Sequence, residues 1–82
     1  MYLSVKEVKV LDEYKLLLTF ENGEIRLFDM NPYLEKGIFK ELKDISLFKS
    51  AKVIFDTVEW GNEADIDPET LYEESIPYGH SS

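Results

Sequence analysis

Residues 14–29, YKLLLTFENGEIRLFD, decide the fold of this chain. Over residues 14–20 every second side chain is aromatic or aliphatic, so these are expected on the core face of a strand: Tyr14, Leu16, Leu18 and Phe20. Asn22-Gly23 then favours a hairpin, because both central residues of a type I′ turn need a positive φ. The returning strand, residues 24–29, is predicted to face the core with two side chains, Ile25 and Leu27.

A third strand precedes this hairpin. Residues 5–10 are β-rich, with Val8 and Val10 alternating against charged neighbours. Val5 is out of phase with them, which indicates a β-bulge or the start of the strand. Residues 11–14 supply a tight turn into the next strand, so the first third of the chain predicts a three-stranded antiparallel meander.

The middle of the chain changes to short helical patterns. Asn31-Pro32 is typical of a helix start, an asparagine cap before a proline at the first helical position, and Gly37 should end that turn. Residues 38–42 are expected to form a second turn, and Asp44 to cap a third over residues 45–50. These turns should bury one side each: Ile38, Phe39, Leu42, Leu47 and Phe48.

The last third predicts a hairpin and a helix. Residues 52–55 and 57–60 are β-branched and aromatic and should pair around an Asp56-Thr57 turn, and a helix over residues 68–75 should end at Ile76-Pro77. The fold class is therefore α+β. We expect a small antiparallel sheet, made of a three-stranded meander and a C-terminal hairpin, with short helical turns in the middle and a short C-terminal helix.

The start of that last helix has its own signature. Asp67 is expected as the N-cap, with its carboxylate accepting a hydrogen bond from the Thr70 amide. A proline at the first helical position, an acid in the first turn and a hydrophobic staple across the cap complete the pattern. Helix-start architecture thus accounts for five residues without a ligand: Ile66, Asp67, Pro68, Glu69 and Leu71.

Length and composition favour one packed domain. The chain has 82 residues, 44% hydrophobic and 13% aromatic, which is enough apolar material for a core rather than disorder. We expect a single domain over residues 1–76, with Trp60 in its core, and a flexible tail over residues 77–82 that contains His80. The core of so small a domain is thin. A homodimer would enlarge it, although no sequence feature requires one.

The residue types exclude several classes of protein. The chain has no cysteine, which excludes disulfides, cysteine zinc sites and thiol nucleophiles, and favours a cytoplasmic location. No signal peptide is visible, and the longest aliphatic run, residues 16–18, is too short to span a membrane. Direct binding to nucleic acid is not expected, because a net charge of −8 repels phosphates and no basic stripe is interleaved with aromatics.

The charge is unevenly distributed along the chain. Residues 1–52 hold all 9 basic residues and as many acids, whereas residues 53–82 hold the remaining acids of the chain's 17 and no Lys or Arg. Such a surface would steer a basic protein partner. The acids and the amide that capping leaves unexplained are the candidate contact residues: Asn62, Glu63, Asp65, Glu73 and Glu74. A plain solvated acidic face is the simplest alternative.

Two chemical alternatives use the same acids. The loop over residues 62–69 offers oxygen ligands for a hard cation, although its spacing does not fit an EF-hand. Carboxylate catalysis would need Asp56, Glu59 and Asp65 to converge. The only histidine lies in the tail, so the usual nucleophile–base pairs cannot form; we expect no catalytic residue, no metal and no cofactor.

The motifs along residues 1–75 resemble the bacterial domain-of-unknown-function family numbered 2442. The most specific block is residues 65–72, DIDPETLY, preceded by the Val58-Glu59-Trp60 step. Its signature residues here are Trp60, Asp67, Pro68, Leu71 and Tyr72. The block at residues 20–23 and the pairing of Leu42-Lys43-Asp44 with Phe48 also match. One departure is Glu63, where many members have glycine.

The resemblance implies a small α+β domain without established catalytic residues. Some family members are encoded beside another small uncharacterised family, which implies an antitoxin-like role for this domain. The expected function is therefore a non-enzymatic protein-interaction module, whose partner would be a basic protein encoded nearby.

Overall fold

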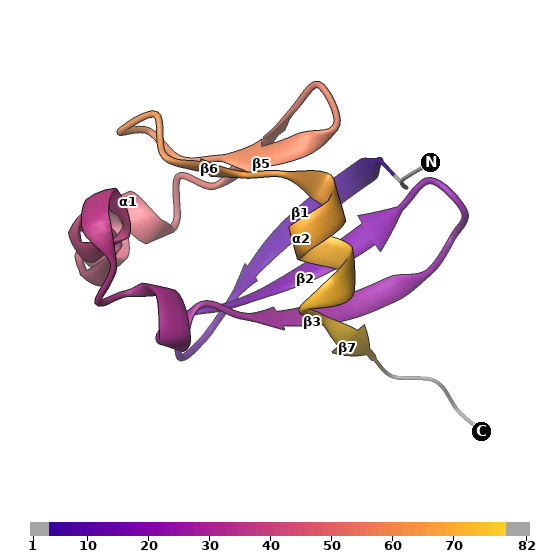
Figure 1. Ribbon diagram of the computed structural model, residues 1–82, viewed down its shortest axis with the longest axis horizontal. Helices are drawn as coiled ribbons and strands as arrows, with labels where there is room; N and C mark the ends of the chain where they lie inside the picture. Colours follow the sequence, from indigo (N-terminus) through magenta and orange to yellow (C-terminus); the bar gives the residue numbers. More distant parts are fainter. Residues whose placement is uncertain (1–3, 79–82) are drawn as a thin grey trace.

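The computed structural model describes residues 4–78 and has the predicted α+β class (Figure 1). Its strands form two small antiparallel sheets in that part of the chain. The larger has the order β1-β2-β3-β7, with bounds Val5–Leu11, Lys15–Phe20, Ile25–Asp29 and Ile76–Pro77. The smaller has the order β4-β5-β6, with bounds Lys52–Ile54, Thr57–Glu59 and Asp65–Ile66.

Short helical segments connect the two sheets. Between β3 and β4 lie two 3-10 turns and one α-helical turn: η1 (Asn31–Tyr33), η2 (Gly37–Lys43) and α1 (Ile45–Phe48). The C-terminal helix α2 (Pro68–Glu73) follows β6 and leads into β7. In Figure 1, α1 lies at one end of the molecule and α2 stands between the two sheets near the other end.

The core lies between the sheets and is rich in aromatic rings. Trp60 is only 1% exposed, as predicted, and its Nε1 donates a hydrogen bond to the Phe48 carbonyl oxygen at 3.1 Å. The two rings stack with centroids 6.2 Å apart. Further ring contacts extend this stack from the larger sheet to the helical turns, through Tyr14, Phe39, Tyr33 and Phe28.

The meander β1-β2-β3 forms as predicted. Residues 16, 18 and 20 of β2 face the core and are fully buried. The pairing of β1 with β2 shifts between Val5 and Glu7, so the β-bulge expected from the phase of Val5 is present. It lets Val5 join the core face, where it is 2% exposed.

The turn between β2 and β3 differs from the prediction. Asn22 does not have a positive φ, whereas Gly23 has a φ of 91°, so a type I′ turn is absent. The Gly23 N–H donates to the Phe20 carbonyl oxygen and the Phe20 N–H to the Glu24 carbonyl oxygen, both at 2.9 Å. Residues 21–23 thus form a three-residue loop that ends in a left-handed glycine.

That extra loop residue reverses the face of β3. Leu18 pairs with Arg26 and Leu16 pairs with Phe28, so Arg26 and Phe28 point to the inner side of the sheet. The prediction that Ile25 and Leu27 face the core was wrong: Ile25 is 44% exposed. The cause is geometric, since a one-residue change in register moves every side chain of a strand to the opposite face.

Asn31 has a different role from the predicted helix cap. Met30 occupies the cap position of η1, and no side chain caps it. The Asn31 Nδ2 instead donates to the Glu13 carbonyl oxygen at 2.9 Å and to Asp29 Oδ1 at 2.8 Å. It therefore ties the β1–β2 turn to the end of β3. Both Glu13 and Tyr14 in that turn have positive φ values, 64° and 61°.

Asp44 caps α1 as predicted, since its side chain accepts from the Ser46 N–H at 3.0 Å. Of the apolar residues expected to be buried by the turns, Leu42 and Phe48 are fully buried and Phe39 and Leu47 are partly buried. Ile38 was predicted to be buried but is 46% exposed. In a 3-10 helix such as η2, residues three apart lie on the same face. Leu42 therefore shares a face with Phe39, whereas Ile38, four residues before Leu42, lies on another face.

The C-terminal hairpin and helix are shifted slightly from their predicted positions. Ile54 pairs with Thr57, so the turn is Phe55-Asp56, one residue earlier than expected. Helix α2 ends at Glu73, two residues early, and Ile76–Pro77 form β7 rather than a mere helix end. The Tyr78 N–H donates to the Ile25 carbonyl oxygen at 3.0 Å, so backbone pairing continues past the domain end predicted at residue 76. The remaining tail, residues 79–82 with His80, lies outside the described residues.

Candidate functional site

The acids of the C-terminal third lie on β5, β6, α2 and their connections, and most are exposed. The three ion pairs within residues 4–78 use acids from the first half of the chain: Glu13 with Lys15, Glu24 with Arg26, and Glu35 with Lys43. From Glu59 onward the acids have no ion pair in that part of the chain: Glu59, Glu63, Asp65, Asp67, Glu69, Glu73 and Glu74. The acids of β5, β6 and α2, together called the acidic face below, are therefore neutralised by no ion pair within residues 4–78.

Asn62 shapes the loop between β5 and β6. Its Oδ1 accepts from the Ala64 N–H at 3.1 Å, and its Nδ2 donates to Glu41 Oε1 at 2.8 Å. The loop repeats the pattern of residues 20–24, because the Glu63 N–H donates to the Trp60 carbonyl oxygen and the Trp60 N–H to the Ala64 carbonyl oxygen. Asn62 thus belongs to a fixed loop that projects the exposed Glu63.

Asp65 lies directly opposite Glu59 in the pairing of β5 with β6. Their neighbours Val58 and Ile66 are buried, so the two acids point to the outer side of the smaller sheet. Like charges directly opposite each other weaken a strand pair, and Lys52, which lies opposite Glu59 on its other side in β4, offsets part of that repulsion. Sequence reasoning missed β6 because two residues are too short for an alternating pattern.

Glu73 and Glu74 lie at the C-terminal end of α2, whose last turn contains no basic residue, although Arg26 of β3 lies near this helix end and donates to the Ser75 carbonyl oxygen. Negative charge at this end interacts unfavourably with the partial negative charge of the last carbonyl groups. Both side chains are exposed. A cation supplied by a partner would therefore relieve repulsion here as well as at Asp65.

Asp67 caps α2 as predicted. Its Oδ2 accepts from the Thr70 N–H at 3.0 Å and its Oδ1 from the Thr70 hydroxyl at 2.8 Å. These hydrogen bonds to the ionised form lower the pKa of the Asp67 carboxyl below its usual value. Ile66, Pro68 and Leu71 are all buried beneath the cap, as the signature implies.

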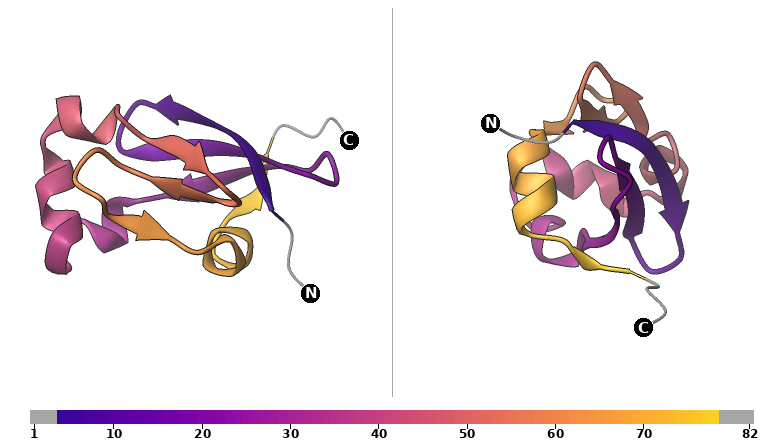
Figure 2. Two further views of the ribbon diagram at one scale, coloured as in Figure 1. Left: turned by 90° about the horizontal axis from the view of Figure 1, so that it is seen from above. Right: turned by 90° about the vertical axis from the view of Figure 1, so that its right-hand side faces the viewer.

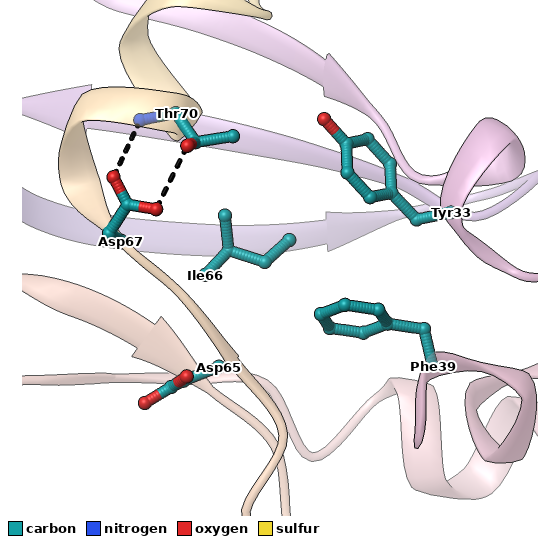
Figure 3. A pocket seen from close by; sticks show the side chains of 6 residues that line it. All are labelled: Tyr33, Phe39, Asp65, Ile66, Asp67 and Thr70. Carbon is teal, nitrogen blue, oxygen red and sulfur yellow. Dashed lines mark hydrogen bonds between the residues drawn. The ribbon is translucent and has the colours of Figure 1, made fainter. Parts of the chain in front are cut away.

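An open pocket of about 330 Å³ lies beside this cap (Figure 3). Ile66 points into it from one side, and the rings of Tyr33 and Phe39 line the other. Asp65, Asp67 and Thr70 complete the lining, although Figure 3 shows the Asp65 carboxylate turned away from the two rings. Tyr33 and Phe39 could not be assigned to this site from sequence, because they come from η1 and η2, far from residues 65–70 in the chain.

The negative charge around this pocket acts on Tyr33. Burial raises the pKa of its hydroxyl, and the charges of Glu74 and Asp67 raise it further. The Lys36 Nζ lies 5.4 Å from the centroid of the same ring. One cation thus already contacts Tyr33, in a surrounding that favours positive charge.

Arg26 fixes α2 against the larger sheet. Its Nε donates to Ser75 Oγ at 2.8 Å and its Nη2 to the Ser75 carbonyl oxygen at 2.7 Å. The guanidinium lies 4.2 Å from the Tyr72 ring centroid, and the Tyr72 hydroxyl donates to Glu24. This network was not predicted, because Arg26 was expected on the outer face. It sets the position of the acidic helix.

The two chemical alternatives gain no support from the geometry. Within residues 4–78 no group of three or more acidic or histidine side chains could hold a metal ion. Asp67 in the loop of residues 62–69 is engaged in capping. Asp65 lies opposite Glu59 on an open sheet face, with its carboxylate turned away from the pocket rings, and neither Glu59 nor Asp56 lines that pocket.

A family model described as protein of unknown function (DUF2442) matches residues 5–77. The chain belongs to this family. No curated protein and no solved structure matches it significantly. No helix among the described residues of this DUF2442 protein is long and apolar enough to cross a membrane.

The one departure from the DUF2442 pattern now has a structural meaning. Glu63 has a φ of 72°, the left-handed conformation that glycine adopts without steric cost. The equivalent position of the matching loop is Gly23, with a φ of 91°. The loop is therefore not reshaped by Glu63; the chain keeps the glycine geometry and exposes a carboxylate at the tip.

Proposed function

We propose that this protein is a non-enzymatic interaction module that binds a basic protein through its C-terminal acidic face. The observation that carries the proposal is the set of acids from Glu59 to Glu74 that have no ion pair within residues 4–78. Asp65 and Glu59 lie opposite each other in a strand row to which Lys52 supplies the one positive charge, and Glu74 lies at the end of α2, where negative charge is unfavourable. A basic partner would relieve both repulsions on binding.

The pocket of Tyr33, Phe39 and Ile66 adds an apolar anchor to this face. Lysine and arginine side chains pack their aliphatic stems on apolar surface while keeping the charged group near carboxylates. The ring of Tyr33 and the charges of Asp67 and Glu74 suit such an occupant. Electrostatic steering would bring the partner to the face, and the pocket would hold one side chain.

An antitoxin-like role fits this chemistry. The resemblance implies a neighbouring gene for some family members, and the product of that gene is the first partner to test. In this role the acidic face would cover a basic surface that the partner needs for its own activity. Binding would then both form a complex and suppress any growth defect that the partner causes.

The test is co-purification and titration with the product of the adjacent gene. Glu73→Lys combined with Glu74→Lys should weaken the complex at least about tenfold, because two attractions become repulsions. Asp12→Lys combined with Glu21→Lys is the matched control, since both acids are exposed and lie in the first half of the chain. The control should leave the affinity within about twofold. No complex, or an equal loss in both variants, would refute the proposal.

A further inference from the structure

The outer face of the larger sheet is unusually apolar. Leu17 pairs with Leu27, and Leu27 pairs with Ile76, so three aliphatic side chains form a row across β2, β3 and β7. Ile25 and Tyr78 lie beside this row and are 44% and 47% exposed, and Ile76 is 59% exposed. An antiparallel sheet with one solvated face normally alternates apolar inward and polar outward residues. Here both faces are apolar.

Nothing in the described part of the chain covers this face. The smaller sheet and α2 lie on the inner side of the larger sheet (Figure 2, right). The core that they close contains Leu16, Leu18 and Phe28 but none of the outward residues of the row. Continuous apolar runs, as in residues 16–18, are typical of strands that are buried on both sides.

The charges around the row are nearly balanced. Lys9 pairs with Leu17 and Glu7 with Thr19 at one margin, and Lys15 pairs with Asp29 at another. These four paired residues, two lysines and two acids, carry no net charge, and Glu13, which forms an ion pair with Lys15, adds one negative charge at the margin, in a protein whose total is −8. Two copies could therefore bring these faces together with little net repulsion between them, and the margins offer both signs for pairing across a two-fold axis.

A basic partner has no reason to choose this face. Its attraction is to the acids without an ion pair on β5, β6 and α2, whereas the row itself contains no acid. An apolar centre with a nearly neutral, mixed-charge margin is instead complementary to itself. We propose that the protein forms a symmetric homodimer through the outer face of β2, β3 and β7, with Leu17, Leu27 and Ile76 at the centre of the interface.

The size of the face sets the expected affinity. Strands spaced by about 4.8 Å and rising about 3.3 Å per residue give a footprint on the order of 300–400 Å² per copy. Standard protein interfaces bury about 800 Å² per partner, so this dimer is at the weak end. We therefore expect a dissociation constant on the order of 100 μM and a concentration-dependent mass.

Analytical ultracentrifugation from about 10 μM to about 1 mM protein tests the dimer over the range expected for so small an interface. The wild type should shift from monomer to dimer mass. Ile25→Lys combined with Ile76→Lys should raise the dissociation constant at least about tenfold, because two exposed aliphatic contacts become charges. The control is Ile38→Lys combined with Ile45→Lys, which changes two isoleucines that are 46% and 44% exposed and lie off this face. It should dimerise like the wild type.

A second measurement on the wild type itself keeps the test independent of folding in the variants. Dilution of the labelled protein should shift the amide resonances of β2, β3 and β7, and leave those of α2 in place. A monomer over the whole concentration range, or a dimer that survives the Ile25 and Ile76 changes as well as the control, would overturn the inference. Added salt separates this dimer from binding of a basic partner, since screening should weaken the charge-driven complex much more than an interface with an apolar centre.

Discussion

Gly23 and Glu63 hold the same place in two loops of equal length and equal hydrogen bonding. In each loop an asparagine Oδ1 accepts the backbone N–H two residues later, from Asn22 to Glu24 and from Asn62 to Ala64. The left-handed conformation costs a non-glycine residue about 1–2 kcal/mol. Glu63 retains that cost and gains an exposed charge at the loop tip.

Glu63→Gly should stabilise the protein by about 0.5–1 kcal/mol. The change removes the steric cost of the left-handed conformation, and the greater entropy of glycine in the unfolded chain offsets part of that gain. The midpoint of thermal unfolding should rise by a few degrees, about 4–8 °C per kcal/mol for a domain of this size. Gly23→Ala is the reciprocal variant and should destabilise the protein by a similar amount. No atom lies within 4 Å of the added Cβ, so the cost comes only from holding alanine at a positive φ. A lower melting temperature for Glu63→Gly would contradict the loop assignment.

Arg26→Lys should destabilise the protein by about 1–3 kcal/mol, although it conserves the charge. Lysine cannot reproduce the two hydrogen bonds to Ser75 or the stacking on Tyr72. Urea unfolding measures the change. Lys43→Ala is the control, because its ion pair with Glu35 is exposed to solvent and should contribute little to stability. Equal effects for the two variants would mean that Arg26 is not an inner-face residue.

Among the helices and strands, the sequence predicted correctly those features that depend on residues of a single segment. The Asp67 cap, the Asp44 cap and the bulge at Val5 each depend on residues a few positions apart, and each was predictable. The face of β3 was not, because it depends on whether its turn has two or three residues. Asn22-Gly23 is compatible with both, and the choice decided whether Arg26 or Ile25 entered the core.

Asp67 makes α2 sensitive to acid. Its pKa is lowered in the folded state, so its contribution to stability is present above the unfolded pKa of about 4 and is lost as the pH falls through the folded pKa. Asp67→Asn should keep most of the neutral-pH stability, because asparagine also caps, and should lose less stability between neutral and acidic pH. Asp67→Ala should cost about 1 kcal/mol at neutral pH. Unfolding at neutral and acidic pH compares the three proteins, and an unchanged acid sensitivity in Asp67→Asn would argue against the cap.

At the scale of the whole molecule, Trp60 reports the packing of both sheets. It stacks on Phe48 and contacts Phe39, so its fluorescence should be blue-shifted in the folded protein and should move to longer wavelength on unfolding. Since it is the only tryptophan of the chain, the signal has a single source. A water-like emission from the folded protein would contradict the buried position.

The candidate site was predictable only in part. The charge imbalance and the exposed acids could be read from the sequence, because they are properties of composition and local capping. The pocket could not, because Tyr33 and Phe39 meet Ile66 only after the two sheets pack together. Likewise, the apolar outer face of the larger sheet becomes visible only once the register of β3 is known.

The whole molecule then presents two surfaces of opposite character. Salt should weaken binding at the acidic face of β5, β6 and α2, because long-range attraction between exposed charges is screened. It should weaken association through the apolar outer face of β2, β3 and β7 much less. The smaller sheet packs against the inner side of the larger sheet, so in a dimer through the outer face β5 and β6 would remain free to bind a partner.

Chemical-shift mapping with the product of the adjacent gene shows directly whether the acidic face of β5, β6 and α2 is the binding surface. The labelled protein is titrated with that product, and each backbone amide reports whether it lies at the interface. We expect the largest chemical-shift changes over residues 63–74, with further changes at Tyr33 and Phe39. All of these changes should be lost in the Glu73→Lys, Glu74→Lys variant. Shifts confined to the outer face of β2, β3 and β7, or no shifts at all, would contradict the proposed binding surface.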